Sequence, residues 1–203
     1  MSATEILLLR HAQSEGNEGG RFGGHGPTPL TPLGRKQAAA TAKALAHEGG
    51  LTAIFSSDLV RAVETAQPLC AATEIPLRAT PALRERAVGV FTGLTFAEAE
   101  ARHPVEYAAM MAREPAACPP QGETVQACLA RAAAFLDETM AGRAGERVLF
   151  VSHAFTLNLL LRRLLQVESP VVFFRTDNCG LHRLKRQQNG LWTVEALNDR
   201  RHL

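Results

Sequence analysis

The sequence lacks several features that mark specialised classes of protein. Among its 203 residues, Lys and Arg number 22 and Asp and Glu number 20, so the net charge of +2 provides no general basic face. Nucleic-acid and membrane-surface binders need such a face. No apolar run approaches the roughly 20 residues that span a bilayer. We therefore expect neither a nucleic-acid partner nor a membrane partner.

Cysteine is also sparse, and its pattern is uninformative for metal or redox chemistry. The four cysteines have no paired short spacing, so they form neither a zinc-ribbon motif nor a dithiol motif. We expect reduced, mostly buried thiols. No signal peptide is visible, because the first apolar run, residues 6–9, is short and ends at Arg10. These observations predict a cytoplasmic location.

What is present is an ordinary globular composition, with 46% hydrophobic and 21% charged residues. A chain of this length can bury a continuous core without disulfides, and the sequence predicts one domain over residues 1–203. The densest basic run, residues 183–186, lies in a predicted strand. Since charge runs usually face solvent, we expect this run to form a solvated strand face.

Short apolar runs alternate with helical patterns along the chain. The runs at 6–9, 53–55, 77–79 and 148–151 predict strands, and the segments at 31–49, 59–72, 123–140 and 155–165 predict helices. Two further strands, 180–186 and 191–197, flank Asn189-Gly190, which is typical of a hairpin turn. This order predicts an α/β fold with three α/β/α layers, in which a mostly parallel sheet has an antiparallel edge strand.

The regular pattern breaks between residues 85 and 120. Thr95 and Glu98 fit a capping box that opens a short helix, which is expected to end near His103. Prolines at 104, 115, 119 and 120 then interrupt the chain. We expect a helical cap insertion at about 95–120 and not a layer of the core.

Basic side chains follow three of the predicted strands. Arg10 and His11 follow the first strand, Arg61 lies one helical turn beyond the second, and His153 follows the run at 148–151. Ligands of open α/β sheets bind beyond the carboxyl ends of the strands, so these groups should converge there. Two guanidinium and two imidazole groups in one crevice would repel one another unless an anion were bound. Because the arginine fork matches phosphate oxygens, the sequence predicts a phosphate site.

The same residues lie in a longer set of motifs, at 9–17, 29–34, 56–66, 83–85 with Gly89 and Gly93, 122–124, 151–154 and 198–203. In this order, and over essentially the whole chain, they resemble the histidine phosphatase superfamily, the phosphoglycerate mutase-like group. Ala12 stands where that family usually has glycine. The exchange preserves the turn provided that the backbone at residue 12 is not left-handed.

The resemblance implies a metal-independent phosphoric monoester hydrolase that needs no cofactor and forms a phosphohistidine. His11 matches the nucleophile and Glu85 the proton donor, while Arg10, Arg61 and His153 match the groups that hold the phosphoryl oxygens. The implied partner is a small soluble phosphomonoester, and the oligomeric state stays open, with a homodimer as one option. The positions expected to line the substrate site are Asn17, Arg21, Gly23 and Ala154.

Elementary chemistry agrees with these roles. Phosphoryl transfer needs a nucleophile in line, neutralisation of three oxygens and a proton for the leaving alkoxide. Neighbouring arginines should keep His11 neutral and therefore nucleophilic. Glu85 must be protonated when the substrate binds, and the negative charge of the substrate favours that state. Selectivity for the leaving group is expected to come from the cap and from the loop at 21–29.

Weaker expectations concern four other polar residues. We expect Asp58 and Glu64 to be helix caps or ion-pair partners, and Glu15 to be a solvated loop acid. His25, in the loop that borders the site, is left open as a substrate contact.

Three alternatives remain at the level of sequence. A cofactor-dependent phosphoglycerate mutase is one, although Arg102 and Arg113 in the insertion do not form the paired clamp of such mutases. The segment 21–24 also has glycine where a threonine is usual. A metal hydrolase built on two histidines and Glu85 is the second, and the neighbouring arginines oppose it. A non-catalytic phosphoester-binding domain is the third.

Overall fold

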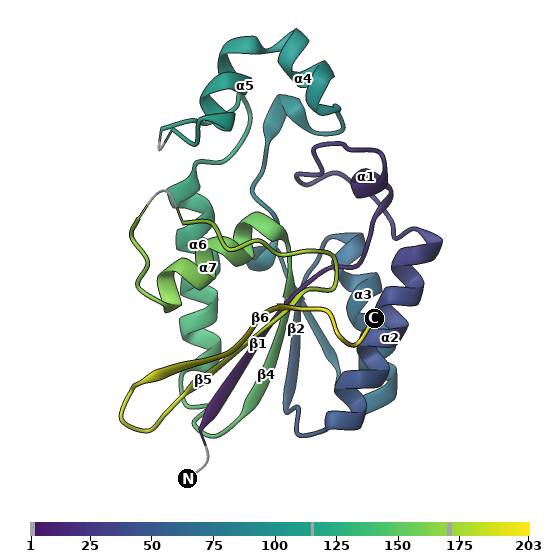
Figure 1. Ribbon diagram of the computed structural model, residues 1–203, viewed down its shortest axis with the longest axis vertical. Helices are drawn as coiled ribbons and strands as arrows, with labels where there is room; N and C mark the ends of the chain where they lie inside the picture. Colours follow the sequence, from purple (N-terminus) through teal and green to yellow (C-terminus); the bar gives the residue numbers. More distant parts are fainter. Residues whose placement is uncertain (1–2, 115, 170–171) are drawn as a thin grey trace.

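A six-stranded sheet forms the centre of the computed structural model, which describes residues 3–114, 116–169 and 172–203 (Figure 1). Its strand order is β3-β2-β4-β1-β5-β6. The pairs β1–β4, β2–β4 and β2–β3 are parallel, whereas β5 pairs antiparallel with β1 and β6 with β5. The strands are β1 Thr4–Arg10, β2 Ala53–Ser57, β3 Leu77–Thr80, β4 Arg147–Ser152, β5 Leu181–Arg186 and β6 Trp192–Asp199.

The predicted α/β class is therefore confirmed, with a mostly parallel sheet and an antiparallel edge. At that edge, β5 runs opposite to its neighbours, and β6 pairs antiparallel with it in the predicted hairpin. Gly190 closes its turn with φ of +84°, a left-handed conformation that glycine adopts without steric cost. The α-helices are α1 Glu15–Glu18, α2 Pro32–Glu48, α3 Val60–Thr73, α4 Phe96–Arg102, α5 Pro104–Met111, α6 Val125–Met140 and α7 Ala154–Leu164, and the 3-10 helices are η1 Pro81–Leu83 and η2 Gly89–Phe91.

Two hydrophobic clusters, one on each face of the sheet, hold the layers together. Side chains alternate across a strand, so Leu7 and Leu9 of β1 join a cluster with α2 and α3, whereas Ile6 and Leu8 join a cluster with α6 and α7. All four are nearly inaccessible to solvent. Burial on both faces explains why the central strands are uniformly apolar in sequence.

The helix boundaries follow the capping signals in the sequence. Thr31 accepts a hydrogen bond from Gly34 N at the start of α2, and Thr95 forms the expected capping box with Glu98 at the start of α4. Thr124 caps α6, so that helix begins two residues into the predicted segment. Within the described residues, no helix is both long and apolar enough to cross a membrane.

The basic run at 183–186 differs from its prediction. Arg183 is mostly buried and forms ion pairs with Glu48 of α2 and Glu5 of β1, at 2.7 and 4.0 Å. Leu184 points into the core, as the alternation of a strand requires. The run therefore joins the sheet to α2 and is not simply a solvated face.

The cysteine prediction is only partly right. All four thiols are free, but Cys70 is half-buried and Cys118 is exposed, so only Cys128 and Cys179 are buried. Burial raises the pKa of Cys128 to about 12 and that of Cys179 to about 11. These two thiols are neutral under physiological conditions.

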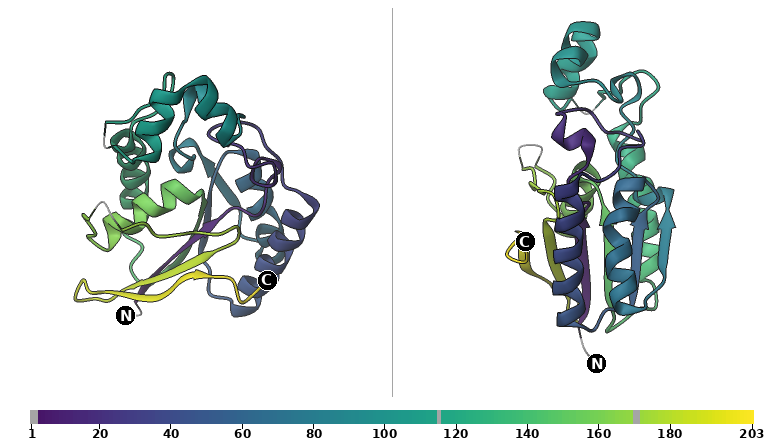
Figure 2. Two further views of the ribbon diagram at one scale, coloured as in Figure 1. Left: turned by 45° about the horizontal axis from the view of Figure 1, so that its top comes forward. Right: turned by 90° about the vertical axis from the view of Figure 1, so that its right-hand side faces the viewer.

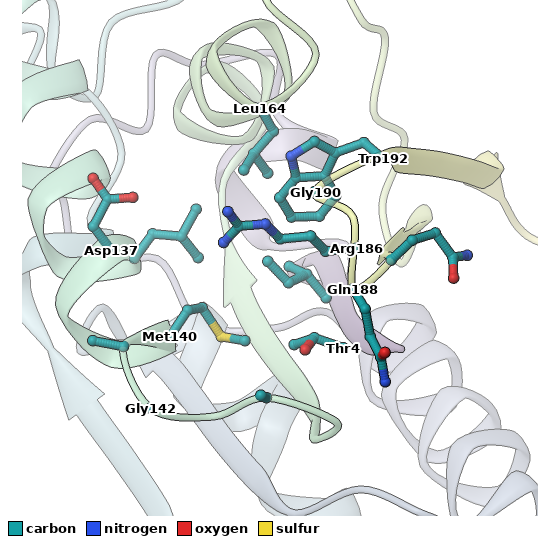
Figure 3. A pocket seen from close by; sticks show the side chains of 14 residues that line it. Thr4, Asp137, Met140, Gly142, Leu164, Arg186, Gln188, Gly190 and Trp192 are labelled. Carbon is teal, nitrogen blue, oxygen red and sulfur yellow. The ribbon is translucent and has the colours of Figure 1, made fainter. Parts of the chain in front are cut away.

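The two ends of the sheet differ in what lies beyond them. Helices α4 and α5 lie beyond the carboxyl ends of the parallel strands, at the top of the molecule in Figures 1 and 2. A pocket of about 520 Å³ opens at the opposite end, between α6 and the β5–β6 hairpin (Figure 3). It is lined by Thr4 at the start of β1, by Met140 and by Trp192.

The start of α2 fixes the loop that follows β1. Thr31 N donates to Gln13 O at 3.0 Å. A Cβ atom at Gly34 would lie 2.0 Å from that same carbonyl oxygen, so only glycine allows this approach. Gln13 is two residues from His11, and the contact therefore positions the segment that carries this histidine.

Replacing Gly34 with alanine should force α2 and the loop apart. We expect G34A to lower the free energy of unfolding by about 1–3 kcal/mol, the usual cost of overpacking a close contact. Urea denaturation measures this change, with A39S on the exposed side of α2 as the control, expected within about 0.5 kcal/mol of the parent. A G34A variant as stable as the parent protein would show that the contact is loose.

Candidate active site

Three neighbouring strands end at one place and bring the two histidines together. Arg10 of β1 pairs in register with Ser152 of β4, and His11 N donates to Ser152 O at 3.0 Å. His11 and His153 therefore follow adjacent strands, and their ring centroids lie 5.0 Å apart. The carboxyl ends of parallel strands meet at one edge, as the sequence analysis assumed.

The ring of His11 has a defined tautomer. Its Nδ1 lies 2.7 Å from the carbonyl oxygen of Ala12, which can only accept a hydrogen bond, so Nδ1 carries the proton. The Nε2 atom then presents its lone pair. Burial, together with the charges of Arg10 and Arg61, lowers the pKa of His11 well below the usual 6.5. His11 is thus a neutral imidazole with Nε2 as the available base or nucleophile.

Ala12 fits the turn after β1. It is fully buried, its N–H donates to Thr65 Oγ1 at 2.9 Å, and it is not among the residues with positive φ. The backbone at residue 12 is therefore not left-handed, so alanine can stand where the family usually has glycine without distorting the turn. The bond to Thr65 links the turn to α3, and within this helix Thr65 donates to Arg61 O.

The two arginines of the site are held by backbone carbonyls. Arg61 Nη2 donates to Gly24 O at 2.8 Å and Nη1 to Gly26 O at 3.0 Å, while Arg10 Nη1 donates to Thr176 O at 2.7 Å. Burial lowers the pKa of Arg61 to about 10, so it stays charged at neutral pH. In the described part of the chain, neither guanidinium forms an ion pair with a carboxylate.

Two buried polar atoms of the site lack a partner in the part of the chain that the structure describes. They are Arg10 Nε and His153 Nδ1. His153 Nε2 is 2.8 Å from Ser57 Oγ, and burial, followed by the charge of Arg61, lowers its pKa well below 6.5. An unpaired buried donor costs free energy, which an anionic ligand would recover. With two uncompensated guanidinium groups, the site is suited to a phosphoryl group.

The side chain of Glu85 reaches the start of α7. Its carboxylate accepts hydrogen bonds from Phe155 N and Thr156 N, both at 3.1 Å. Phe155 and Thr156 lie in the first turn of α7, so their N–H groups have no partner within the helix and can bind the carboxyl oxygens. Because α7 follows His153, the carboxylate is held next to this histidine, where a proton donor for a bound phosphate ester is required.

The residues predicted to line the substrate site have different environments. A Cβ atom on Gly23 would lie 3.5 Å from Arg61 Nη2, so Gly23 packs on that guanidinium, and Ala154 is the first residue of α7. Asn17 accepts from Ser14 at the start of α1 and from Asn178. Arg21 donates to Gly93 O and pairs with Glu98 at 3.3 Å. Their roles towards a substrate remain predictions.

The secondary polar candidates are occupied by contacts within the protein. Arg84 pairs with Asp58 through both carboxylate oxygens, and Arg35 pairs with Glu64 at 3.2 Å, as expected for ion-pair partners. Glu15 is exposed. His25 Nε2 donates to Glu85 O at 2.8 Å and so contacts the backbone of the predicted acid.

Several residues at the site had no signal in the sequence. Asn178 Nδ2 donates to His11 O at 3.0 Å, and Thr176 provides the carbonyl that holds Arg10. Both lie in a loop without periodic pattern or recognisable motif. Arg131 of α6 contacts the segment that carries Glu85, and a lone arginine in an amphipathic helix is indistinguishable from a solvated one.

The metal-hydrolase alternative requires a cluster of side chains that can bind a metal ion. Across residues 3–114, 116–169 and 172–203, no three side chains of His, Cys, Asp or Glu lie close enough to hold a metal ion. The arrangement of His11, His153 and Glu85 in this fold does not form the ligand cluster that the metal-hydrolase alternative requires.

Together, the fold and the site define an α/β protein with a positively charged site, suited to a phosphoryl group, at the carboxyl edge of its sheet. Residues 6–200 match the histidine phosphatase superfamily (branch 1), and the chain belongs to this family. This confirms the resemblance seen in the sequence. The chain has the fold and the site of a phosphoric monoester hydrolase of the histidine phosphatase type.

Relatives in this family have several functions. The chain is 35% identical over 196 residues to a bifunctional protein of Mycobacterium tuberculosis, covering 96% of this chain but 54% of that protein, so it spans about half the length of that relative. It is 31% identical over 202 residues to a metal-independent phosphoserine phosphatase of Arabidopsis thaliana, covering 98% and 83% of the two chains. A "Probable phosphoglycerate mutase GpmB" of Proteus mirabilis is 30% identical over 205 residues, with coverage of 98% and 94%.

Solved structures of phosphatases have a fold similar to that of this chain. A mycobacterial glucosyl-3-phosphoglycerate phosphatase in complex with VO3 matches with a TM-score of 0.84 at 29% sequence identity. The match covers 97% of this chain and 99% of that one.

The tautomer and charge of His11 can be measured directly. At pH 6.5, the usual pKa of imidazole, we expect a histidine-selective ¹⁵N–¹H spectrum to show His11 neutral, with its proton on Nδ1. The physical reason is the bond to Ala12 O together with burial beside two arginines. The H11A variant assigns the signal. A charged His11, or a proton on Nε2, would contradict the proposed state of the nucleophile.

Proposed function

We propose that this protein is a metal-independent phosphatase that hydrolyses a small soluble phosphomonoester through a phosphohistidine on His11. The observation that carries the proposal is the neutral imidazole of His11, whose Nε2 is available next to the guanidinium groups of Arg10 and Arg61. A neutral nitrogen nucleophile beside fixed positive charges is suited to attack on phosphorus.

The first half of the reaction forms the phosphoenzyme. His11 Nε2 attacks phosphorus, the bond to the ester oxygen breaks, and the leaving alkoxide takes a proton from Glu85. Arg10, Arg61 and His153 stabilise the charge on the three phosphoryl oxygens. The bond from Ala12 O to the Nδ1 proton stabilises the positive charge that develops on the ring.

The second half returns the enzyme to its starting state. Water attacks phosphorus on the opposite side from Nε2 and gives a proton to the Glu85 carboxylate, and the bond to His11 breaks. Inorganic phosphate leaves with Glu85 again protonated. The kinetics are therefore ping-pong, with water as the second acceptor.

The substrate class that we infer, a small phosphomonoester, follows from the predicted phosphate site. Relatives named as phosphoserine phosphatase and as glucosyl-3-phosphoglycerate phosphatase support a soluble phosphomonoester, but they differ in the leaving group. We expect the cap and the loop at 21–29 to select among such esters. One domain over residues 1–203, a cytoplasmic location, the absence of nucleic-acid and membrane partners, and the homodimer option remain predictions.

A phosphoglycerate mutase is the second candidate, supported by the mutase-named relative. Mutases of this group clamp a second charged group of the substrate with paired arginines. Here the guanidinium of Arg113 stacks on Phe173, 4.6 Å from the ring centroid, and Arg102 lies in the last turn of α4. This arrangement favours hydrolysis over retention of the phosphoryl group.

The central test is hydrolysis of p-nitrophenyl phosphate in excess EDTA. We expect the parent protein to be active and H11A to lose activity by about 10⁴-fold or more, as removal of a covalent nucleophile does elsewhere. H47A, which replaces an exposed histidine on α2, is the matched control and should retain full activity. Turnover by H11A at the parental rate, or activity abolished by EDTA, would refute the mechanism.

Glu85→Gln tests the proton donor. We expect the variant to lose about 10²–10⁴-fold in kcat/KM with an alkyl phosphate, whose leaving alkoxide needs a proton. The loss in kcat/KM with p-nitrophenyl phosphate should be about tenfold or less, because p-nitrophenolate leaves without protonation. In a ping-pong reaction kcat/KM reports formation of the phosphoenzyme and not its hydrolysis, which also needs Glu85, so equal losses in kcat/KM would argue against the acid role.

A further inference from the structure

The segment that carries Glu85 has no regular secondary structure. Residues 84–87 lie between η1 and η2 and belong to no helix or strand. Their backbone carbonyls are therefore not fixed by a ladder or a helix. A general acid has to be held within a few tenths of an ångström of its productive position, so other groups must fix this segment.

Arg131 of α6 provides that support. Its Nη1 donates to Ala82 O at 2.8 Å and to Arg84 O at 2.9 Å, and its Nη2 donates to Glu85 O at 3.0 Å. One rigid guanidinium thus binds three carbonyls within four residues of chain, the last of them on the predicted acid itself. A lysine ammonium has no planar fork and cannot reproduce this pattern.

Glu123, just before α6, holds the guanidinium from the other side. Its carboxylate accepts from Arg131 Nε at 2.7 Å and from Nη2 at 2.8 Å. Burial disfavours the charged form of Glu123, but its bonds to Arg131 outweigh burial and lower its pKa. The side chains of both residues are mostly buried. Glu123 N also donates to Ala87 O, which joins the pair to the far end of the segment.

The carboxyl group of Glu85 is fixed separately, by Phe155 N and Thr156 N of α7. Two anchors on the helices thus hold Glu85: α7 binds the side chain, and Arg131 on α6 binds the backbone, where His25 also donates to Glu85 O. Helices α6 and α7 pack together in the same hydrophobic cluster, through Ala132, Leu136 and Leu157 among others. The two anchors therefore form one rigid frame.

We propose that Arg131, oriented by Glu123, is a positioning residue that holds Glu85 in place for proton transfer to the leaving group. The inference rests on the proposed function and deepens it, since it assigns a role in the same reaction to two residues that do not touch the substrate. It predicts a specific kinetic pattern. Loss of the Arg131 contacts should impair only the steps in which Glu85 moves a proton.

The test compares leaving groups in R131K and E123Q. With an alkyl phosphate, kcat should fall by about ten- to a hundredfold, a part of the contribution of general acid catalysis. With p-nitrophenyl phosphate, formation of the phosphoenzyme, measured as the burst of p-nitrophenolate, should stay within about threefold of the parent, because this step needs no proton from Glu85. KM should change little, since the phosphate ligands are intact.

D137N is the matched control. Asp137 also lies on α6 and pairs with Arg163 of α7 at 2.5 Å, so the variant removes an ion pair from the same helix without touching the Glu85 segment. It should leave both substrates unaffected. A double variant, R131K with E85Q, should be no slower than E85Q alone on the alkyl phosphate, because the two changes act on one proton transfer.

The outcomes separate the inference from the function on which it rests. If E85Q discriminates between the two substrates and R131K and E123Q do not, the positioning role is wrong and Glu85 remains the acid. If E85Q loses both substrates equally, the acid assignment fails and the positioning role fails with it. Circular dichroism and urea denaturation check folding, and if R131K does not fold, E123Q carries the test, because it keeps the shape of the side chain.

Discussion

The burial of two positive guanidinium groups among backbone carbonyls is the constraint on which the site depends. Arg10 and Arg61 are bound by the carbonyls of Thr176, Gly24 and Gly26, which satisfy hydrogen bonds without cancelling charge. Other arginines in the described chain, such as Arg84, pair with carboxylates instead. The positive charge therefore remains available at the site, where, in addition to burial, it lowers the pKa of both histidines and favours an anion.

Another arginine bound by backbone carbonyls, Arg131, lies behind the predicted acid, Glu85. Arg131 also binds carbonyls, but Glu123 cancels its charge, so that it supports structure and adds little field. Carbonyl-bound arginines thus differ between these two places in whether a carboxylate accompanies them. The difference is electrostatic: the unpaired guanidinium groups of Arg10 and Arg61 favour an anion, whereas the paired guanidinium of Arg131 holds the segment that carries Glu85.

Much of the fold could be predicted from the sequence, because its signals are local. The apolar runs identified β1, β2 and β4, and the caps at Thr31 and Thr95 placed the starts of α2 and α4. The predictions failed where a contact partner lies far away in sequence. Arg183 pairs with Glu48 on a helix 135 residues earlier, and no local pattern shows such a pairing.

The sequence by itself determined which groups come together, since His11, Arg61 and His153 follow strands whose carboxyl ends meet at one edge of a parallel sheet. Only the tertiary structure decided their chemical state. The tautomer of His11 depends on the direction of one carbonyl, that of Ala12, and its neutrality depends on burial beside two arginines. The position of Glu85 depends on α6 and α7. The contact between His11 and Ala12 is local, but the turn that directs it is held by the bond from Ala12 N to Thr65 of α3. The burial of His11 and the position of Glu85 likewise depend on groups far apart in the chain, which meet only after the helices have packed on the sheet.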